Sequence, residues 1–559
     1  MNRRSNAYNH SVVHNPYSSH LRKIRRLTVS AGLGLAIASF LTTASCAQTT
    51  APAGPTAGGR ILLVLPFDNR TGQPSLEWIR EAAAEILSRR FRSAGFAPMS
   101  RDDRRYALDH LGLPQGFQPS RASALKLAET VDADSIVVGS YLTDGTAIVA
   151  EARLVDVAHL RMGDAVTARG EMRDLIAVFG ALAWKLTRQM DPGFSVAQET
   201  FVAAGAGLRL DAFEQYIRGI TEPDQGERVR HLNQSVMLSP DYGQAWMALG
   251  REDYGSQQYE QAAAAFAKVG RGDPDALEAG FYRGLALTFS GDYPQAEEVF
   301  AGVARVLPLA EVLNNQGVAL SRQGKDGIPQ YRQAVATDPN EADYHFNLAV
   351  SLKRHGDAAG AATEITQCLR LRANDSEAQE LDRAWKGLPP EPVPAGEQVV
   401  KADPLERIAR NFDAQAFRQA AQMMDQMEAS RLAALTPRDR ARKLAGQAND
   451  YLDRGLLLEA ERLYQSANAA DAKVAEAHAG LAEVRERSGD SETARSEAHA
   501  ALELNPSAGA YLVLGRLDLA AGRVDEANRE AGEALRLDPV NRAAQELRRQ
   551  IEAKQGQKQ

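Results

Sequence analysis

One stretch decides the fold: QAWMALGREDYGSQQYEQAAAAFAKVGRGDP, residues 244–274, followed by DALEAGFYRGLALTFSGDYPQAEEVFAGVARVLP, residues 275–308. Its landmarks recur 34 residues apart. Pro240, Pro274 and Pro308 share one position of this period, and Gly250 and Gly284 share another. Apolar residues at helical spacing fill the intervals. The period therefore predicts a chain of paired helices, in which each proline ends a unit because it cannot continue a helix.

The small residues explain how such units pack. A glycine in the first helix lets its partner approach closely, and glycine takes the left-handed backbone of the turn at Gly291 cheaply. Landmarks of the same kind occur again beyond residue 403, where Gly455, Gly489 and Gly522 share the turn position. This pattern resembles the tetratricopeptide repeat, whose units bury their apolar faces by stacking. We expect about eight units, five before residue 387 and three after residue 440.

The predicted fold class is therefore mostly α: a tetratricopeptide-type helical solenoid in two segments, preceded by a small α/β domain. Four prolines between residues 389 and 394 predict an extended spacer within the chain. The helical pattern continues after it but fits the repeat poorly up to residue 436. The expected divisions are a leader (1–47), a tether (48–59), an α/β domain (60–192), a first array (205–387), a linker (388–403), and a helical adaptor with a second array and a carboxy-terminal cap (404–559).

The α/β segment shows a change of hydrophobic period. Ile61 to Leu65 is a continuous apolar run, which predicts a strand buried on both faces. The period becomes helical from Leu76 and ends at Gly95. Asp144-Gly145, between two β-rich runs, predicts a hairpin turn.

Two motifs of this segment resemble the amino-terminal domain of TolB-like and CsgG-like bacterial envelope proteins. They are Pro66-Phe67-Asp68-Asn69-Arg70-Thr71-Gly72 after the first strand and Ala133-Asp134-Ser135-Ile136-Val137-Val138-Gly139-Ser140 where the hairpin begins. The resemblance implies an assembly and interaction module. For CsgG-like domains it also implies a head that assembles into a ring.

The amino-terminal leader predicts export. Residues 22–26 are Arg-Lys-Ile-Arg-Arg, an apolar run follows from Leu27 to Leu41, and small residues continue to Ala47. This order is the layout of a secretory signal. The apolar run is shorter than the roughly 20 residues of a spanning helix. We expect the body in the periplasm or cell envelope; the alternative is an inner-membrane anchor formed by the apolar run.

Cys46 has two interpretations. In one, cleavage after Ala47 removes it together with the leader. In the other, Thr43-Ala44-Ser45-Cys46 is a lipobox, and the Cys46 thiol carries a lipid that attaches an outer-membrane lipoprotein by its amino terminus. Thr43 departs from the leucine usual at the first position of a lipobox.

The sequence contains no motif that is typical of a catalytic site. It holds two cysteines and ten histidines, none at metal-ligand spacing, and it lacks His-Glu-x-x-His and Gly-x-Ser-x-Gly. We therefore expect no catalytic, cofactor or metal site, and Cys368 to be a packed core thiol. The net charge is −7, and the basic residues gather in the leader. An acidic body excludes nucleic acid as the main partner.

The repeat register also gives candidate binding residues, because the first helix of each unit lines the concave face of such arrays. Their mixture of apolar, amide and cationic groups suits an extended peptide or a partner helix. The alternative is that this face only packs against the α/β domain. A carboxylate clamp is not expected, since Met247 and Arg251 replace its lysine and asparagine. The candidates are Met247, Arg251 and Tyr254, then Asn314, Asn315 and Val318, then Phe346, Asn347, Val350 and Lys353.

These patterns predict a non-enzymatic, exported interaction scaffold or assembly factor of the bacterial cell envelope. Its partners are proteins, and it uses no cofactor. The second hypothesis is an outer-membrane-associated transport or secretion component whose α/β head oligomerises. Size-exclusion chromatography separates the two, because a ring is a large oligomer.

Overall fold

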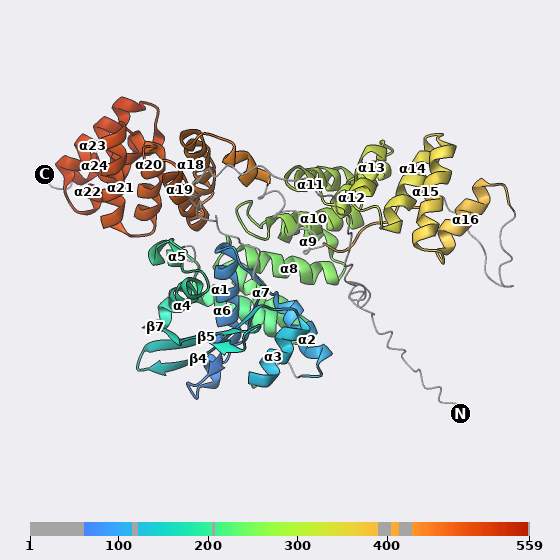
Figure 1. Cartoon of the computed structure of the whole chain (residues 1–559), viewed down its shortest axis with the longest axis horizontal. Coiled ribbons are helices and arrows are strands. Elements are labelled where there is room, and N and C mark those ends of the chain that lie inside the picture. Colours follow the sequence, from blue (N-terminus) through green and yellow to red (C-terminus); the bar gives the residue numbers. More distant parts are fainter. Residues whose placement is uncertain (1–60, 114–120, 204–206, 389–403, 413–426, 557–559) are drawn as a thin grey trace, which may run out of the picture. The chain divides into compact units, whose positions relative to one another are not determined.

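The computed structural model describes residues 61–113, 121–203, 207–388, 404–412 and 427–556 (Figure 1). An α/β region comes first and a helical solenoid follows, which is the predicted fold class. The leader with Cys46, the tether and the proline-rich linker lie outside the described residues. Within those ranges, no helix has both the length and the apolar character needed to cross a membrane.

The α/β region is built on one seven-stranded sheet. Strand β1 lies parallel between β3 and β4, and β4 pairs antiparallel with β5, which also pairs with β6 and β7; β2 is parallel to β4. The predicted hairpin is confirmed, with Asp144 opposite Ala147 and Gly145 at φ +64°. The strands are β1 (Ile61–Val64), β2 (Asp68–Asn69), β3 (Ala97–Pro98), β4 (Ser135–Asp144), β5 (Ala147–Asp156), β6 (Arg161–Met162) and β7 (Val166–Glu171).

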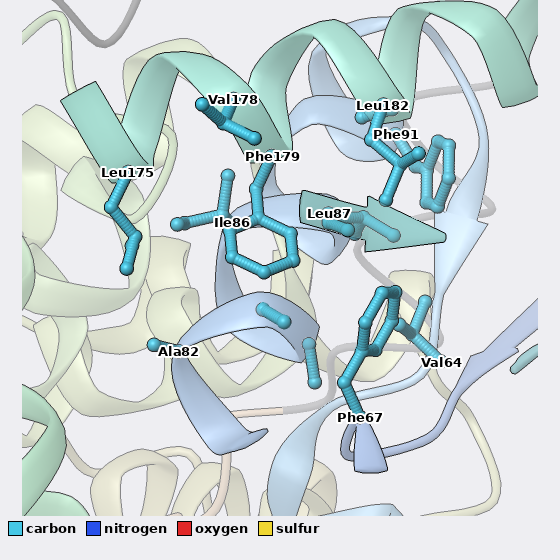
Figure 2. Close-up of a cluster of buried hydrophobic side chains, with 14 of the residues drawn as sticks. Val64, Phe67, Ala82, Ile86, Leu87, Phe91, Leu175, Val178, Phe179 and Leu182 are labelled. Atoms are coloured by element: carbon cyan, nitrogen blue, oxygen red, sulfur yellow. The ribbon is translucent and has the colours of Figure 1, made fainter. Parts of the chain in front are cut away.

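Both faces of the sheet are covered by helices. Leu62 and Val64 belong to the core shared with α1 (Ile79–Ser93) and α4 (Leu175–Met190). The intervening Leu63 belongs to a second core with α2 (Arg101–His110) and α3 (Arg121–Thr130). The prediction that this strand is buried on both faces is therefore confirmed. Figure 2 shows the first core, where Phe67 meets Phe179 edge to face with their ring centres 5.6 Å apart.

Helix hairpins make up most of the rest of the described chain. The short α5 (Gln198–Ala203) precedes them. The first array consists of α6 (Leu210–Thr221), α7 (Gln225–Leu238), α8 (Gly243–Gly255), α9 (Tyr259–Phe266), α10 (Ala276–Ser290), α11 (Tyr293–Val306), α12 (Ala310–Arg322), α13 (Ile328–Thr337), α14 (Ala342–Arg354), α15 (Ala358–Leu371) and α16 (Ser376–Trp385). The second consists of α18 (Pro437–Asp453), α19 (Leu457–Ala470), α20 (Ala475–Arg487), α21 (Ser491–Leu504), α22 (Ala508–Ala520), α23 (Val524–Leu537) and α24 (Arg542–Gly556).

Within a hairpin, a glycine of the first helix lies against an aromatic ring of the second. A Cβ at Gly250 would lie 2.7 Å from the Phe266 ring, and one at Gly284 would lie 2.6 Å from the Phe300 ring. A side chain at either position would displace the ring, so these glycines set how closely the helices pack. Gly291, in the turn, has the expected left-handed backbone at φ +87°.

Five joints between hairpins are closed by a side chain that reaches back six residues. Each contacts the carbonyl oxygen of the residue that occupies the end position of the preceding unit. This bond satisfies a carbonyl near a helix end, where helices leave acceptors unpaired. The pairs are Trp246 with Pro240, His345 with Pro339, Gln379 with Ala373, His478 with Ala472, and Gln545 with Pro539, at 2.7 to 3.2 Å.

The contacts of His345 predict that the stability of its joint depends on pH. Its Nδ1 lies 2.6 Å from the carboxylate of Glu364. This hydrogen bond raises the pKa of His345, against burial and the charge of Arg370, which lower it. A pKa raised above the unfolded value of about 6.5 means that the stabilisation is complete below that pH. It is lost as the pH rises through the folded-state pKa.

We expect the His345→Gln variant to lose this pH dependence. Glutamine can still donate to the Pro339 carbonyl, as Gln379 does to Ala373 at the next joint. The urea midpoint of the wild type should therefore fall more between about pH 6 and about pH 8.5 than that of the variant. Equal falls in the two proteins would contradict this role for His345.

Candidate peptide-binding surface

A segment of the chain itself, Pro404–Phe412, lies against the first array. It is not helical, so the helix predicted through residues 404–436 is wrong for these residues. Residues 413–426 lie outside the described residues, and residues 427–433 are helical. The array residues that hold the segment are called here the segment-binding surface: Asn314, Asn315, Arg322, Asp343, Phe346, Asn347, Arg354, Asp375 and Glu377.

Two asparagines each bind both the N–H and the C=O of one residue of the segment. Asn347 accepts a hydrogen bond from the Arg407 N–H at 2.6 Å and donates to the Arg407 carbonyl at 2.7 Å. Asn315 makes the same pair of bonds with Ala409, at 2.9 and 2.8 Å. Because alternate residues are bound, the backbone between them is extended. These bonds replace the helical hydrogen bonds that the sequence pattern predicted.

The repeat register places these asparagines on one face. Asn315 and Asn347 each precede a small residue of a first helix, Gly317 or Ala349, by two positions. Asn314 connects the two sites, since it donates to Asn315 at 3.2 Å and to the Arg407 carbonyl at 3.0 Å, and accepts from Asn347 at 2.8 Å. All three asparagine side chains are buried. Without the segment, their buried amides would lose these hydrogen-bond partners.

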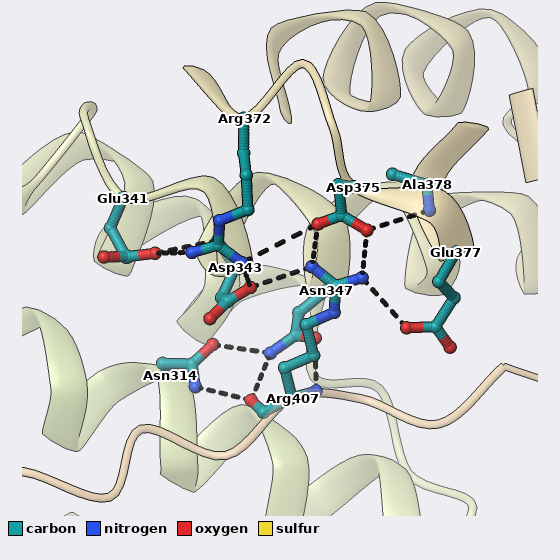
Figure 3. Close-up of polar contacts among 9 residues, drawn as sticks. All are labelled: Asn314, Glu341, Asp343, Asn347, Arg372, Asp375, Glu377, Ala378 and Arg407. Carbon is teal, nitrogen blue, oxygen red and sulfur yellow. Dashed lines mark hydrogen bonds and ion pairs between the residues drawn. The ribbon is translucent and has the colours of Figure 1, made fainter. Parts of the chain in front are cut away.

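The side chain of Arg407 enters an acidic site beside the asparagines, as Figure 3 shows. Its guanidinium donates to both carboxylate oxygens of Asp375, at 2.5 and 2.8 Å. It also donates to Asp343 at 2.8 Å and to Glu377 at 2.9 Å. The guanidinium carbon lies 3.6 Å from the centre of the Phe346 ring. Two parallel bonds to one carboxylate together with stacking on an aromatic face are features that favour arginine over lysine.

The same contacts shift the pKa values of the charged groups in this site. Burial lowers the pKa of Arg407, but its hydrogen bonds to Asp375, Asp343 and Glu377 outweigh burial and raise it. The hydrogen bond from Arg407 lowers the pKa of Asp375, against burial, which raises it. Asp375 also accepts from the backbone N–H of Ala378 at 3.1 Å and so caps α16. The Asp375 carboxylate is therefore held in place by the array and by the segment.

The residue before Arg407 has the opposite charge and meets the opposite environment. Glu406 is only 4% exposed. Its carboxylate forms ion pairs with Arg322, at 3.1 Å, and with Arg354. Arg354 also donates to the carbonyl of Pro404 at 2.5 Å. The array therefore presents a basic pair next to an acidic cluster, and the Glu406-Arg407 dipeptide matches both.

Apolar contacts continue toward the end of the segment. Ile408 packs against two hydrophobic clusters of the first array, one with residues of α8 to α12 and one with residues of α12 to α15. The guanidinium of Arg410 lies 5.1 Å from the centre of the Phe289 ring, and the Phe412 ring lies 5.5 Å from that of Phe281. The segment thus runs from α14 toward α10, opposite to the order of the repeats.

The structure brings some predicted binding residues to the segment. Asn314, Asn315, Phe346 and Asn347 contact it directly. The face therefore neither stands open nor packs on the α/β domain at these positions, because the chain covers it with residues 404–412.

The other predicted residues have different roles. Met247 is 3% exposed and packs in the repeat core, as do Val318 and Val350, so none of the three is presented to a partner. Arg251 pairs with Glu278 at 2.5 Å. Tyr254 lies in an aromatic cluster with Tyr259, Tyr282 and Phe289, and Lys353 lies 5.6 Å from the centre of the Trp385 ring.

Sequence reasoning missed the charged part of the surface. Asp343 follows the start of α14, and Asp375 occupies the capping position of α16, where aspartate is common for local reasons. Arg322 and Arg354 end two helices that belong to different repeats. Only the folded array shows that these charges surround one dipeptide.

Cys368, the cysteine outside this surface that the structure describes, lies in the core of the array. Cys368 is fully buried, and burial raises the pKa of its thiol to about 11. The expected packed core thiol is confirmed. Within the described ranges, His, Cys, Asp and Glu side chains form no group that could hold a metal ion.

Comparison with known families agrees with the repeat register. A family model described as the tetratricopeptide repeat matches residues 247–311 and 321–376. These stretches are tetratricopeptide repeats. They include α12 and α14, which carry most of the segment-binding surface. The comparison with curated proteins found no match.

Several solved structures are similar to parts of the chain. MamA from Desulfovibrio magneticus RS-1 is 24% identical, with 30% of this chain and 99% of that chain covered and a TM-score of 0.28. YrrB, described as a TPR protein with an unusual peptide-binding site, is 14% identical over 36% and 99%, at a TM-score of 0.28. The LpoB C-terminal domain from Escherichia coli is 23% identical over 22% and 88%, at a TM-score of 0.19.

Proposed function

We propose that this chain is a non-enzymatic, exported scaffold of the bacterial cell envelope that binds extended segments of partner proteins on the segment-binding surface. One observation carries the proposal: Asn315 and Asn347 pair with the N–H and C=O groups of alternate residues. Every extended peptide offers these backbone groups. The surface therefore has what is needed to hold a strand and presents no nucleophile or metal site to transform it.

The test is capture of partners from native envelope by photo-crosslinking. The Asn315→Ala/Asn347→Ala double variant should lose its crosslinked partners, because it lacks the two amides that each bind both backbone groups of one residue. Asn528→Ala, at an exposed position on α23, is the matched control and should retain them. Circular dichroism checks that the helices of each variant are intact. If the folded double variant captures the same partners as the wild type, the proposal fails.

Export rests on the basic, apolar and small-residue order of the leader. We expect fractionation to find the protein outside the cytoplasm, either in the periplasm or attached to a membrane. If Cys46 is lipidated, labelling with a lipid precursor should succeed in the wild type and fail in Cys46→Ala. Labelling absent from both proteins would assign Cys46 to the cleaved leader. Full-length protein in the cytoplasm would contradict export.

A further inference from the structure

The segment-binding surface has a more specific chemistry than backbone recognition requires. Asn315 and Asn347 alone would hold an extended peptide of any sequence. Beside them, however, Asp343, Asp375 and Glu377 surround one guanidinium, and Arg322 and Arg354 surround one carboxylate. The two charged sites serve adjacent residues of the bound strand. Their order is fixed, with the acidic residue first.

Charge balance shows why each site needs its ligand. The acidic site contains four carboxylates: Glu341, Asp343, Asp375 and Glu377. From the array they meet one guanidinium, that of Arg372, which pairs with Glu341 at 3.1 Å and with Asp343 at 2.7 Å. Among the described residues, removing Arg407 leaves Asp375 with the backbone N–H of Ala378 and with one more distant cation, Arg372 at 3.6 Å. Grouped carboxylates of this kind are stabilised by a cation, and the planar site selects a guanidinium.

We propose that the segment-binding surface is specific for extended peptides that contain a Glu-Arg dipeptide followed by an apolar residue, and that residues 404–412 are an internal copy of this ligand. The inference rests on the proposed function and adds to it the chemical class of the partner. A partner protein must present Glu-Arg in an unfolded or loop segment. It must also displace the internal segment before it binds.

The internal segment competes strongly with a free peptide because it is tethered to the array. A covalently linked ligand acts at an effective concentration on the order of millimolar when its linker is short and flexible. The affinity of the wild type for a free peptide is reduced by the fraction of molecules in which the surface is open. Disabling the internal segment should therefore reveal an affinity that the wild type conceals.

The experiment uses the full chain and a fluorescent peptide with the sequence of residues 404–412, PLERIARNF. In the receptor, Glu406→Ala and Arg407→Ala disable the internal segment and leave the array unchanged. Fluorescence anisotropy should show that this double variant binds the peptide at least about 10-fold more tightly than the wild type does. Equal affinities would overturn the claim that residues 404–412 occupy the surface.

Two altered peptides test the sequence preference. PLREIARNF reverses the charged pair, and PLEKIARNF replaces arginine by lysine; each should bind at least about 10-fold more weakly than the native peptide. On the receptor side, Asp375→Asn keeps a capping residue for α16 and should remove most of the preference for arginine over lysine. If it instead weakens both peptides equally, Asp375 does not select arginine.

The outcomes separate this inference from the proposed function. If the disabled receptor binds the native and reversed peptides equally, the surface is a general peptide-binding site, and only the Glu-Arg specificity is overturned. If the disabled receptor keeps its native circular dichroism and melting temperature but binds no peptide, the segment is a structural part of the array. In that case both the inference and the proposed function fail.

Discussion

Truncating Phe300 to alanine should lower the free energy of unfolding by about 3–5 kcal/mol. The ring is fully buried between the helices of its hairpin and packs against Phe281, with ring centres 6.2 Å apart. Removing it opens a cavity directly over Gly284, whose missing side chain is what makes room for the ring. Urea denaturation followed by circular dichroism measures the loss.

The same pair of positions allows a double-mutant cycle. Gly284→Leu alone overpacks the contact and should cost about 1–3 kcal/mol. Combined with Phe300→Ala, the leucine enters the vacated space, so the double variant should be more stable than the sum of the single effects by about 1–3 kcal/mol. Gly446→Leu is the control, because a Cβ at this exposed glycine of α18 would meet nothing within 4 Å. Strictly additive effects would show that Gly284 does not face Phe300.

Replacing Arg322 and Arg354 by leucine should release residues 404–412 from the array. The change leaves the carboxylate of Glu406 buried without a counter-ion, a situation that typically costs about 3–5 kcal/mol. The segment can avoid this cost by moving into water, so the effect appears as release and not as global unfolding. Trypsin cleavage after Arg407 and Arg410 should accelerate at least about 10-fold, because the open population rises.

Two further variants make this test decisive. Arg536→Leu removes an exposed arginine that pairs with Glu533 on α23, and it should leave cleavage at residues 407 and 410 unchanged. Adding Glu406→Gln to the double variant removes the uncompensated charge and should slow cleavage again. If the double variant is cut at the wild-type rate, Glu406 does not depend on the basic pair.

The architecture of the arrays could be predicted because its cause lies within each repeat. Gly284 and Gly291 are required by a close helix contact and by a left-handed turn, and both requirements recur in neighbouring repeats at intervals of 32 to 34 residues. The hairpin at Gly145 is local in the same sense. In contrast, the sequence analysis did not predict β7. This strand buries only Ala168, so its sequence lacks the alternation that marks a half-buried strand.

The conformation of residues 404–412 could not be predicted, because it depends on distant partners. Leu405, Ile408, Ala409 and Phe412 have the spacing of one face of a helix. In the structure, Leu405 is 58% exposed, so no such face forms. The asparagines that replace the helical hydrogen bonds are 60 to 94 residues away in the sequence.

The asparagine contacts fix the register of the bound strand on the array. Asn347 and Asn315 occupy equivalent positions in successive repeats, and they bind Arg407 and Ala409, which are two residues apart. The step between these two repeats therefore corresponds to one full period of the bound strand's side-chain alternation, about 6.6–6.8 Å. One residue inserted between Arg407 and Ala409 would turn every later side chain to the opposite face. The array thus selects which side chains of a peptide face it, as well as which residue types they are. A longer run of asparagine-bearing repeats would fix this alternation over a longer strand.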